Sequence, residues 1–64
     1  MKLDEIKLKK EIALRGWTQM VLASRSGVSC VTLSKIYNGG SCSTKTAKKI
    51  VSVLDLELKD MIKE

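Results

Sequence analysis

The sequence predicts a small all-α domain, a compact bundle of five short helices. Three observations support this: no proline occurs in the 64 residues, glycine occurs at only three places, and no apolar run alternates with period two. Glycine readily adopts the left-handed conformation that ends helices, so Gly16, Gly27 and the pair at 39–40 are natural helix boundaries. We therefore expect a single domain over residues 1–64, with a core of modest size.

The first helix is expected over residues 4–15. Asp4 suits the N-cap, and Leu3 and Leu8 occupy the two positions of a hydrophobic staple. Leu8 and Ile12 lie four residues apart and share one face, which predicts that this face packs on the core.

The second and third helices, expected over residues 18–26 and 29–37, use the same combination of cap and staple. Two successive caps with two successive staples indicate two helices joined by a short turn. The cap and staple residues are Thr18, Trp17 and Leu22 in the second helix, and Ser29, Val28 and Leu33 in the third.

A loop is expected over residues 38–42, and Ser43 can cap a fourth helix. Apolar residues then recur at i, i+3, i+4 and i+7, which predicts one buried face. A short fifth helix is expected near the carboxyl end, although Glu57 is a weak cap. The apolar residues are Ala47, Ile50, Val51 and Leu54 in the fourth helix, and Leu58, Met61 and Ile62 in the fifth.

Charge is distributed unevenly along the chain. Residues 12–54 contain six basic residues and no acid, whereas all seven acids lie outside this stretch. A charge of +6 confined to the centre of the chain favours binding to a polyanion. The basic residues are Arg15, Arg25, Lys35, Lys45, Lys48 and Lys49.

The residues from Gln19 onward follow the spacing of a helix-turn-helix. A small residue at Ala23 lets the two helices approach closely, and Gly27 permits a sharp turn with positive φ. Val28, Leu33 and Ile36 hold the second helix of the pair against the core. Such a turn presents that helix outward, where it can enter the major groove of duplex DNA.

The run GWTQMVLASRSGVSCVTLSKIYNG resembles the phage repressor and Cro-type helix-turn-helix family, and the STKTAKKIVSVL segment behind it extends the resemblance over nearly the whole chain. The resemblance implies a five-helix domain that binds operator DNA, usually as a dimer. We therefore expect a sequence-specific transcriptional regulator, a repressor rather than an activator. An antitoxin or another protein-interaction module built on the same domain is the alternative.

The expected recognition helix, residues 29–37, has an inward and an outward side. At about 100° per residue, Leu33 and Ile36 point inward, whereas Val31 and Ser34 point most nearly away, with Cys30 and Lys35 beside them. The corresponding family positions read base edges. A lysine can donate to O6 and N7 of guanine, and a valine can contact the methyl group of thymine. A serine hydroxyl can either donate to a base edge or accept from one. The expected base-reading residues are Cys30, Val31, Ser34 and Lys35.

Phosphate contacts are expected from residues around this helix, because such contacts position the domain without reading sequence. The matching family glutamine binds a phosphate and packs on the recognition helix, and Gln19 also lies in the first turn of a helix, which favours an anion. The expected phosphate-contacting residues are Gln19, Ser29, Asn38 and Lys45, with Lys48 and Lys49 as weaker candidates.

The chain departs from the family pattern at two places. Ile12 and Tyr37 stand where well-known members pair a buried arginine with a glutamate, so an apolar contact is expected instead. Met20 and Val21 stand where polar or acidic residues are frequent. They suggest a protein partner surface, or partial packing of Val21 against a neighbouring helix.

The composition argues against several other classes of protein. With no histidine and two cysteines twelve residues apart, the chain cannot supply four zinc ligands. No catalytic constellation is present, so neither an enzyme nor a cofactor is expected. The amino-terminal segment is neither a signal peptide nor a membrane span, which predicts a cytoplasmic protein. An exposed thiol at Cys30 would also be oxidisable, so redox sensing is a second reading of that residue.

A weak homodimer is expected, formed mainly on DNA. The sequence offers no separate dimerisation domain, and the candidate contacts are few: the end of the third helix, the following loop, and Leu58, Met61 and Ile62. A monomer bound to one half-site would raise the effective concentration of its dimer contact at the neighbouring half-site, so the second monomer would bind more tightly.

Overall fold

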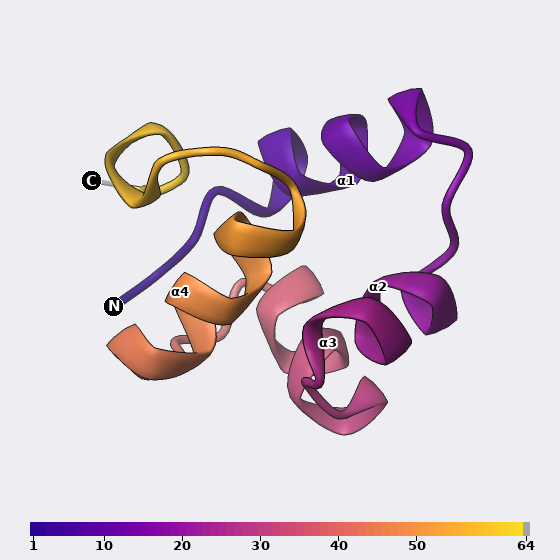
Figure 1. Ribbon diagram of the computed structural model, residues 1–64. Helices are drawn as coiled ribbons and strands as arrows, with labels where there is room; N and C mark the ends of the chain where they lie inside the picture. Colours follow the sequence, from indigo (N-terminus) through magenta and orange to yellow (C-terminus); the bar gives the residue numbers. More distant parts are fainter. Residues whose placement is uncertain (64) are drawn as a thin grey trace.

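The computed structural model describes residues 1–63 and contains four α-helices and one 3-10 turn. Figure 1 shows α1 along one side of the molecule and α2, α3 and α4 grouped on the other. The all-α prediction is confirmed: residues 1–63 contain no strand, only one isolated antiparallel bridge between Leu3 and Ile62. The elements are α1 (Glu5–Leu14), α2 (Gln19–Ser26), α3 (Cys30–Tyr37), α4 (Thr44–Val53) and η1 (Leu58–Asp60).

Each α-helix begins at the N-cap that the sequence predicts. In every case the side-chain oxygen of the cap accepts a hydrogen bond from the backbone N–H three residues later, which satisfies an otherwise free donor of the first turn. The four caps are Asp4, Thr18, Ser29 and Ser43, which accept from the N–H groups of Lys7, Val21, Thr32 and Thr46.

The predicted fifth helix is a single 3-10 turn instead of an α-helix. Leu58–Asp60 forms a single 3-10 turn, and Glu57 makes no side-chain capping bond. The chain leaves helical geometry because its next residues are held elsewhere: Met61 is fully buried, and Ile62 lies opposite Leu3 in the antiparallel bridge. One turn is therefore all that fits between α4 and this bridge.

The turn between α2 and α3 has the predicted geometry. Gly27 has φ +74° and ψ +16°, the left-handed conformation that favours glycine, and its N–H donates to the carbonyl of Ala23. The buried Ser26 hydroxyl donates to the carbonyl of Leu22 and accepts from the N–H of Val28. The turn therefore leaves little polar backbone unpaired, and it fixes how α3 leaves α2.

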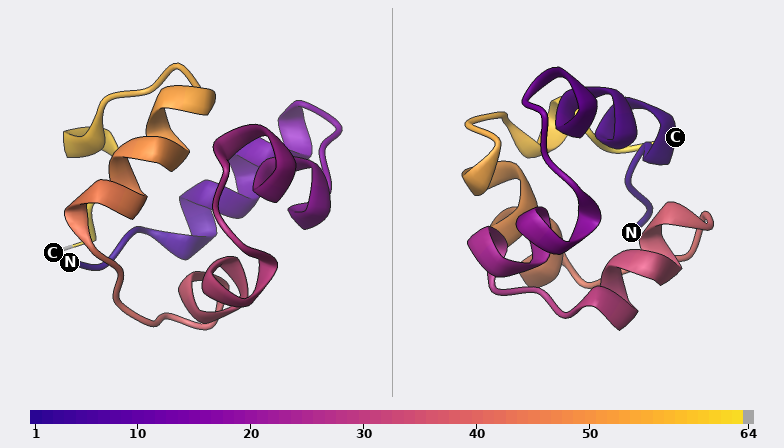
Figure 2. Two further views of the ribbon diagram at one scale, coloured as in Figure 1. Left: turned by 60° about the horizontal axis from the view of Figure 1, so that its bottom comes forward. Right: turned by 90° about the vertical axis from the view of Figure 1, so that its right-hand side faces the viewer.

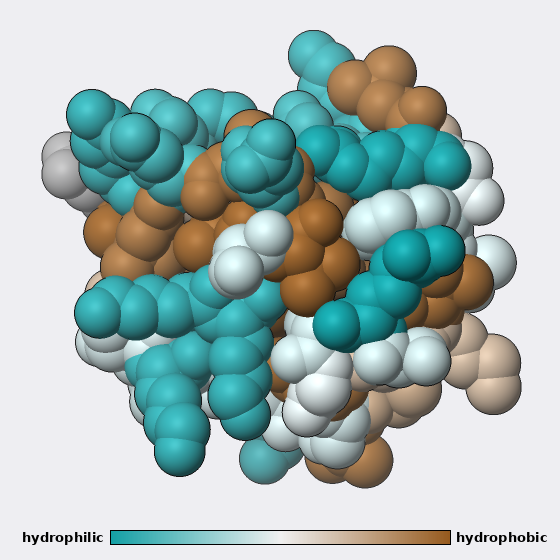
Figure 3. All heavy atoms as spheres, viewed as in Figure 1, coloured by the Kyte–Doolittle hydropathy of each residue, from teal (hydrophilic) through white to brown (hydrophobic). Residues whose placement is uncertain are grey.

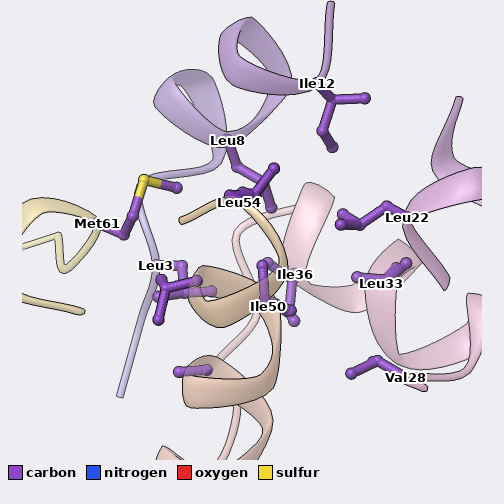
Figure 4. Close-up of a cluster of buried hydrophobic side chains, with 12 residues drawn as sticks. Leu3, Leu8, Ile12, Leu22, Val28, Leu33, Ile36, Ile50, Leu54 and Met61 are labelled. Carbon is purple, nitrogen blue, oxygen red and sulfur yellow. The ribbon is translucent and has the colours of Figure 1, made fainter. Parts of the chain in front are cut away.

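The core joins all four helices and both ends of the chain. Figure 4 shows side chains from α1, α2, α3 and α4 converging with Leu3 and Met61. Because α1 and α2 both pack on α3, and α2 also packs on α4, the orientation of α3 is set by two neighbouring helices. The buried apolar residues are Leu3, Leu8, Ile12, Leu22, Val28, Leu33, Ile36, Ala47, Ile50, Val51, Leu54 and Met61.

The two described ends of the chain pair through the bridge between Leu3 and Ile62, and the left view of Figure 2 shows them close together. The N–H of Asp4 donates to the carbonyl of Met61 at 2.7 Å, and the N–H of Lys63 donates to the carbonyl of Lys2 at 3.0 Å. The N–H of Cys42 donates to the carbonyl of Met1 at 2.8 Å. The first residues therefore tie the loop after α3 to the carboxyl end.

Candidate nucleic-acid interface

The outward side of α3 exposes all four predicted base-reading residues. Val31 keeps 69% of its surface accessible, and Cys30, Ser34 and Lys35 are also exposed. Leu33 and Ile36 are completely buried, as the helical angles predict. An exposed valine beside a serine and a lysine gives this helix one apolar and two polar groups to present to base edges.

A hollow opens beside this row, between α3 and the loop that follows it. Sequence reasoning missed Gly40 and Ser41 as part of this surface. The N–H of Gly40 donates to the carbonyl of Lys35 at 2.7 Å, and a Cβ at position 40 would lie at that same distance from the oxygen. The loop can fold this closely onto α3 only with glycine there. The hollow is lined by Val31, Ser34, Lys35, Asn38, Gly40 and Ser41.

Gln19 lies at the first position of α2 and reaches across to α3. Its side-chain nitrogen donates to the carbonyl of Cys30 at 3.2 Å and to Oγ of Ser34 at 3.0 Å. Both amide hydrogens are therefore used within the protein. The phosphate contact expected of Gln19 stays a prediction, and in this geometry the donors left for it are the backbone N–H groups of the first turn of α2.

Ser29 and Asn38 stand at the two ends of α3. The Ser29 hydroxyl accepts from the N–H of Thr32 and donates to its hydroxyl at 2.9 Å. The side-chain amide of Asn38 donates to the carbonyl of Ser34 at 2.9 Å. Both residues are exposed, so each stabilises a helix end while remaining accessible; their phosphate contacts are still predictions.

The basic residues of the central stretch divide into two groups. Arg15 is half-buried: it donates to the carboxylate of Glu11 at 2.9 Å and to the carbonyl of Leu54 at 2.6 Å. Arg25 lies over the ring of Trp17, 4.8 Å from its centroid, in a cation–π contact. Both arginines therefore have partners within the protein, near the segment that joins α1 to α2.

The four remaining basic side chains are exposed. Among the residues described, none of them takes part in an ion pair. Three lie on α4, a helix without an acid, and Figure 3 shows hydrophilic side chains extending from the surface over α4. These charges are available to a polyanion, and they flank the loop beside α3. The four are Lys35, Lys45, Lys48 and Lys49.

The chain departs from the family pattern at Ile12 and Tyr37 and at Met20 and Val21, and these two pairs differ in burial. Ile12 is buried in the core and Tyr37 packs against that core, while the expected contact between these two side chains stays a prediction. Burial raises the pKa of the Tyr37 hydroxyl above its usual value. Met20 is 73% exposed, whereas Val21 is half-buried, which agrees with partial packing of Val21 rather than with full exposure.

The two thiols differ in environment. Cys30 is exposed at the start of α3, and Cys42 is half-buried in the loop, where burial raises the pKa of its thiol. Within residues 1–63, no three side chains of the metal-binding types come together. None of the helices described is long and apolar enough to cross a membrane.

Comparison with known proteins places the whole site within one matched region. Residues 7–63 match the family described as the Cro/C1-type HTH DNA-binding domain. The chain matches no curated protein and no solved structure at a significant level. The matched region contains α1 from Lys7 onward, all of α2, α3 and α4, and every residue discussed above as a DNA contact.

Proposed function

We propose that this chain, which belongs to the Cro/C1-type helix-turn-helix DNA-binding domain family, recognises one duplex DNA sequence and represses transcription there. The observation that carries this proposal is the outward row of α3, where an exposed valine, serine and lysine stand together. A helix about 10–12 Å wide fits the major groove, where each base pair presents its own pattern of donors and acceptors. Residues 1–64 act as a single domain in this proposal.

Each base-reading residue has a distinct task in the groove. Lys35 donates to O6 and N7 of a guanine, and Val31 contacts the methyl group of a thymine. Ser34 bonds a base edge, and Cys30 fills space at the amino end of the helix. A protein seated in this way blocks access to the same DNA by steric exclusion, which is why repression requires no further part of the chain.

The phosphate contacts surround this helix on both sides. The amino end of α2, with Gln19 at its first position, holds one phosphate through backbone N–H groups. Ser29 and Asn38 bond phosphates at the ends of α3, and Lys45 reaches the backbone from the first turn of α4. These contacts set the register of the domain on DNA and carry no sequence information.

Binding to a pool of random duplexes, followed by sequencing of the bound fraction, tests the proposal. A single enriched motif supports sequence-specific recognition, and enrichment of no motif refutes it. Lys35→Ala and Val31→Ala should then each relax the preference at one base pair, at a cost of about 1–3 kcal/mol on the preferred site. Uniform loss of affinity for all sequences would show that α3 does not read bases.

We also propose that two copies bind an approximate palindrome with half-sites about one helical turn apart. Of the three apolar residues that the sequence suggests for a dimer contact near the carboxyl end, Met61 is completely buried, which leaves Leu58, half-buried, and Ile62. So small a patch supports a weak dimer that forms mainly on DNA. Sedimentation with and without a two-half-site duplex tests this. A tight dimer in the absence of DNA would contradict it.

A second function, as an antitoxin or another protein-binding module, is favoured by the side chain of Met20, which is 73% exposed at the start of α2. A partner protein that purifies with the chain, together with no DNA binding, would support this alternative over the first. In the DNA-binding role we place the protein in the cytoplasm, because its proposed ligand is DNA.

A further inference from the structure

The contact between Gln19 and Ser34 determines which way one hydroxyl hydrogen points. A serine hydroxyl has one hydrogen to donate and two lone pairs that accept. The Gln19 amide donates to Oγ of Ser34 at 3.0 Å and so occupies one lone pair. Gln19 cannot accept through the same nitrogen, so the hydroxyl hydrogen of Ser34 must point elsewhere.

Within the described residues, no group accepts that hydrogen. Among residues 1–63, Ser34 Oγ appears in hydrogen bonds only as the acceptor from Gln19. A serine in mid-helix often donates to the carbonyl four residues earlier, but here the carbonyl of Cys30 accepts from the Gln19 amide instead. Ser34 is exposed beside Val31 and Lys35, so its hydrogen is directed outward from α3.

We propose that Gln19 is a positioning residue that makes Ser34 a hydrogen-bond donor towards DNA, and so restricts the base that Ser34 accepts. This inference rests on the proposed function, in which α3 enters the major groove. Guanine, adenine and thymine each present an acceptor there, whereas cytosine presents only its amino donor. The base facing Ser34 is therefore any base except cytosine.

Substitutions of Gln19 can reverse or remove the preference of the Ser34 hydroxyl to donate towards DNA, without altering Ser34 itself. In Gln19→Glu the carboxylate only accepts, so the Ser34 hydroxyl donates to it and turns lone pairs outward, where the cytosine amino group can donate. In Gln19→Met neither group is present, and the hydroxyl can donate either to the carbonyl of Cys30 or outward. An acid in the first turn of α2 also favours the helix, so the glutamate variant should remain folded.

The experiment measures binding of the wild type and both variants to the selected duplex and to its single-base-pair changes. At one position the wild type should reject cytosine about three- to tenfold, the effect of one hydrogen bond. Gln19→Met should remove this discrimination, and Gln19→Glu should reverse it by a similar factor. Positions read by Lys35 and Val31 should keep their preferences.

Two controls separate polarity from charge. Met20→Glu adds the same negative charge at the neighbouring, 73% exposed position, and it should weaken binding to every duplex alike. In a Ser34→Ala background, Gln19→Glu should no longer change the base preference, because no hydroxyl remains to be turned.

The outcomes are distinguishable. If Gln19→Glu weakens all duplexes equally, or changes the preference equally without Ser34, the positioning role is refuted while DNA recognition stands. If the wild type selects no sequence, the proposed function fails and this inference fails with it.

Discussion

The division of the basic residues makes a quantitative prediction about salt. In the central stretch, only Lys35, Lys45, Lys48 and Lys49 are exposed without a protein partner. About four side-chain charges per monomer, Lys35 at a base edge and the other three at phosphates, can therefore displace counterions from DNA. With a slope near −0.9 per phosphate, the logarithm of affinity should fall by about 3.6 per decade of salt. A fourfold rise in salt should therefore weaken binding about 150-fold.

Removing single charges tests which residues account for this slope. Lys45→Gln should reduce the slope by about 0.9, so that the same fourfold rise in salt weakens binding about 3.5-fold less than in the wild type. Arg25→Gln removes an equal charge but should leave the slope unchanged, because that guanidinium lies over Trp17, 4.8 Å from the ring centroid. The assay is fluorescence anisotropy of a labelled half-site duplex across a salt series.

The comparison between these two variants is decisive. Equal reductions in slope for Lys45→Gln and Arg25→Gln would mean that net charge alone governs binding, and the division of the basic residues would be refuted. A wild-type slope near zero would refute the electrostatic argument altogether. A slope much steeper than that expected for four charges per monomer would show that the two arginines exchange their contacts within the protein for contacts with DNA.

Three other substitutions or reactions test the fold and its loop. Leu33→Ala should lower the free energy of unfolding by about 2–5 kcal/mol in chemical denaturation, because Leu33 is completely buried; a loss below 1 kcal/mol would contradict this. Gly40→Ala should lower the melting temperature and weaken DNA binding, since its Cβ would lie 2.7 Å from the carbonyl oxygen of Lys35; an unchanged protein would show that the loop is free to move. Cys42 should react with a maleimide more slowly than Cys30, because it is half-buried and burial raises its pKa; equal rates, measured by mass spectrometry, would contradict the packing of the loop.

The sequence by itself determined the features that depend on residues close together in the chain. The four caps each bond an N–H three residues away, and Gly27 takes its left-handed conformation within one turn. The separation of buried Leu33 from exposed Val31 follows from helical angles alone. Local periodicity and capping were therefore sufficient to locate α3 and its outward row of residues.

The tertiary structure decided the features that depend on residues far apart. Arg15 donates to the carbonyl of Leu54, 39 residues away, a contact that its sequence neighbours do not indicate. Gln19 donates its side-chain amide to Ser34, fifteen residues away, a contact that its place in the sequence does not indicate; its phosphate contact stays a prediction. The last segment forms a 3-10 turn because Ile62 pairs with Leu3 at the other end of the chain. Hydrogen bonds between distant segments exist only once the core has brought those segments together, so no local pattern in the sequence records them.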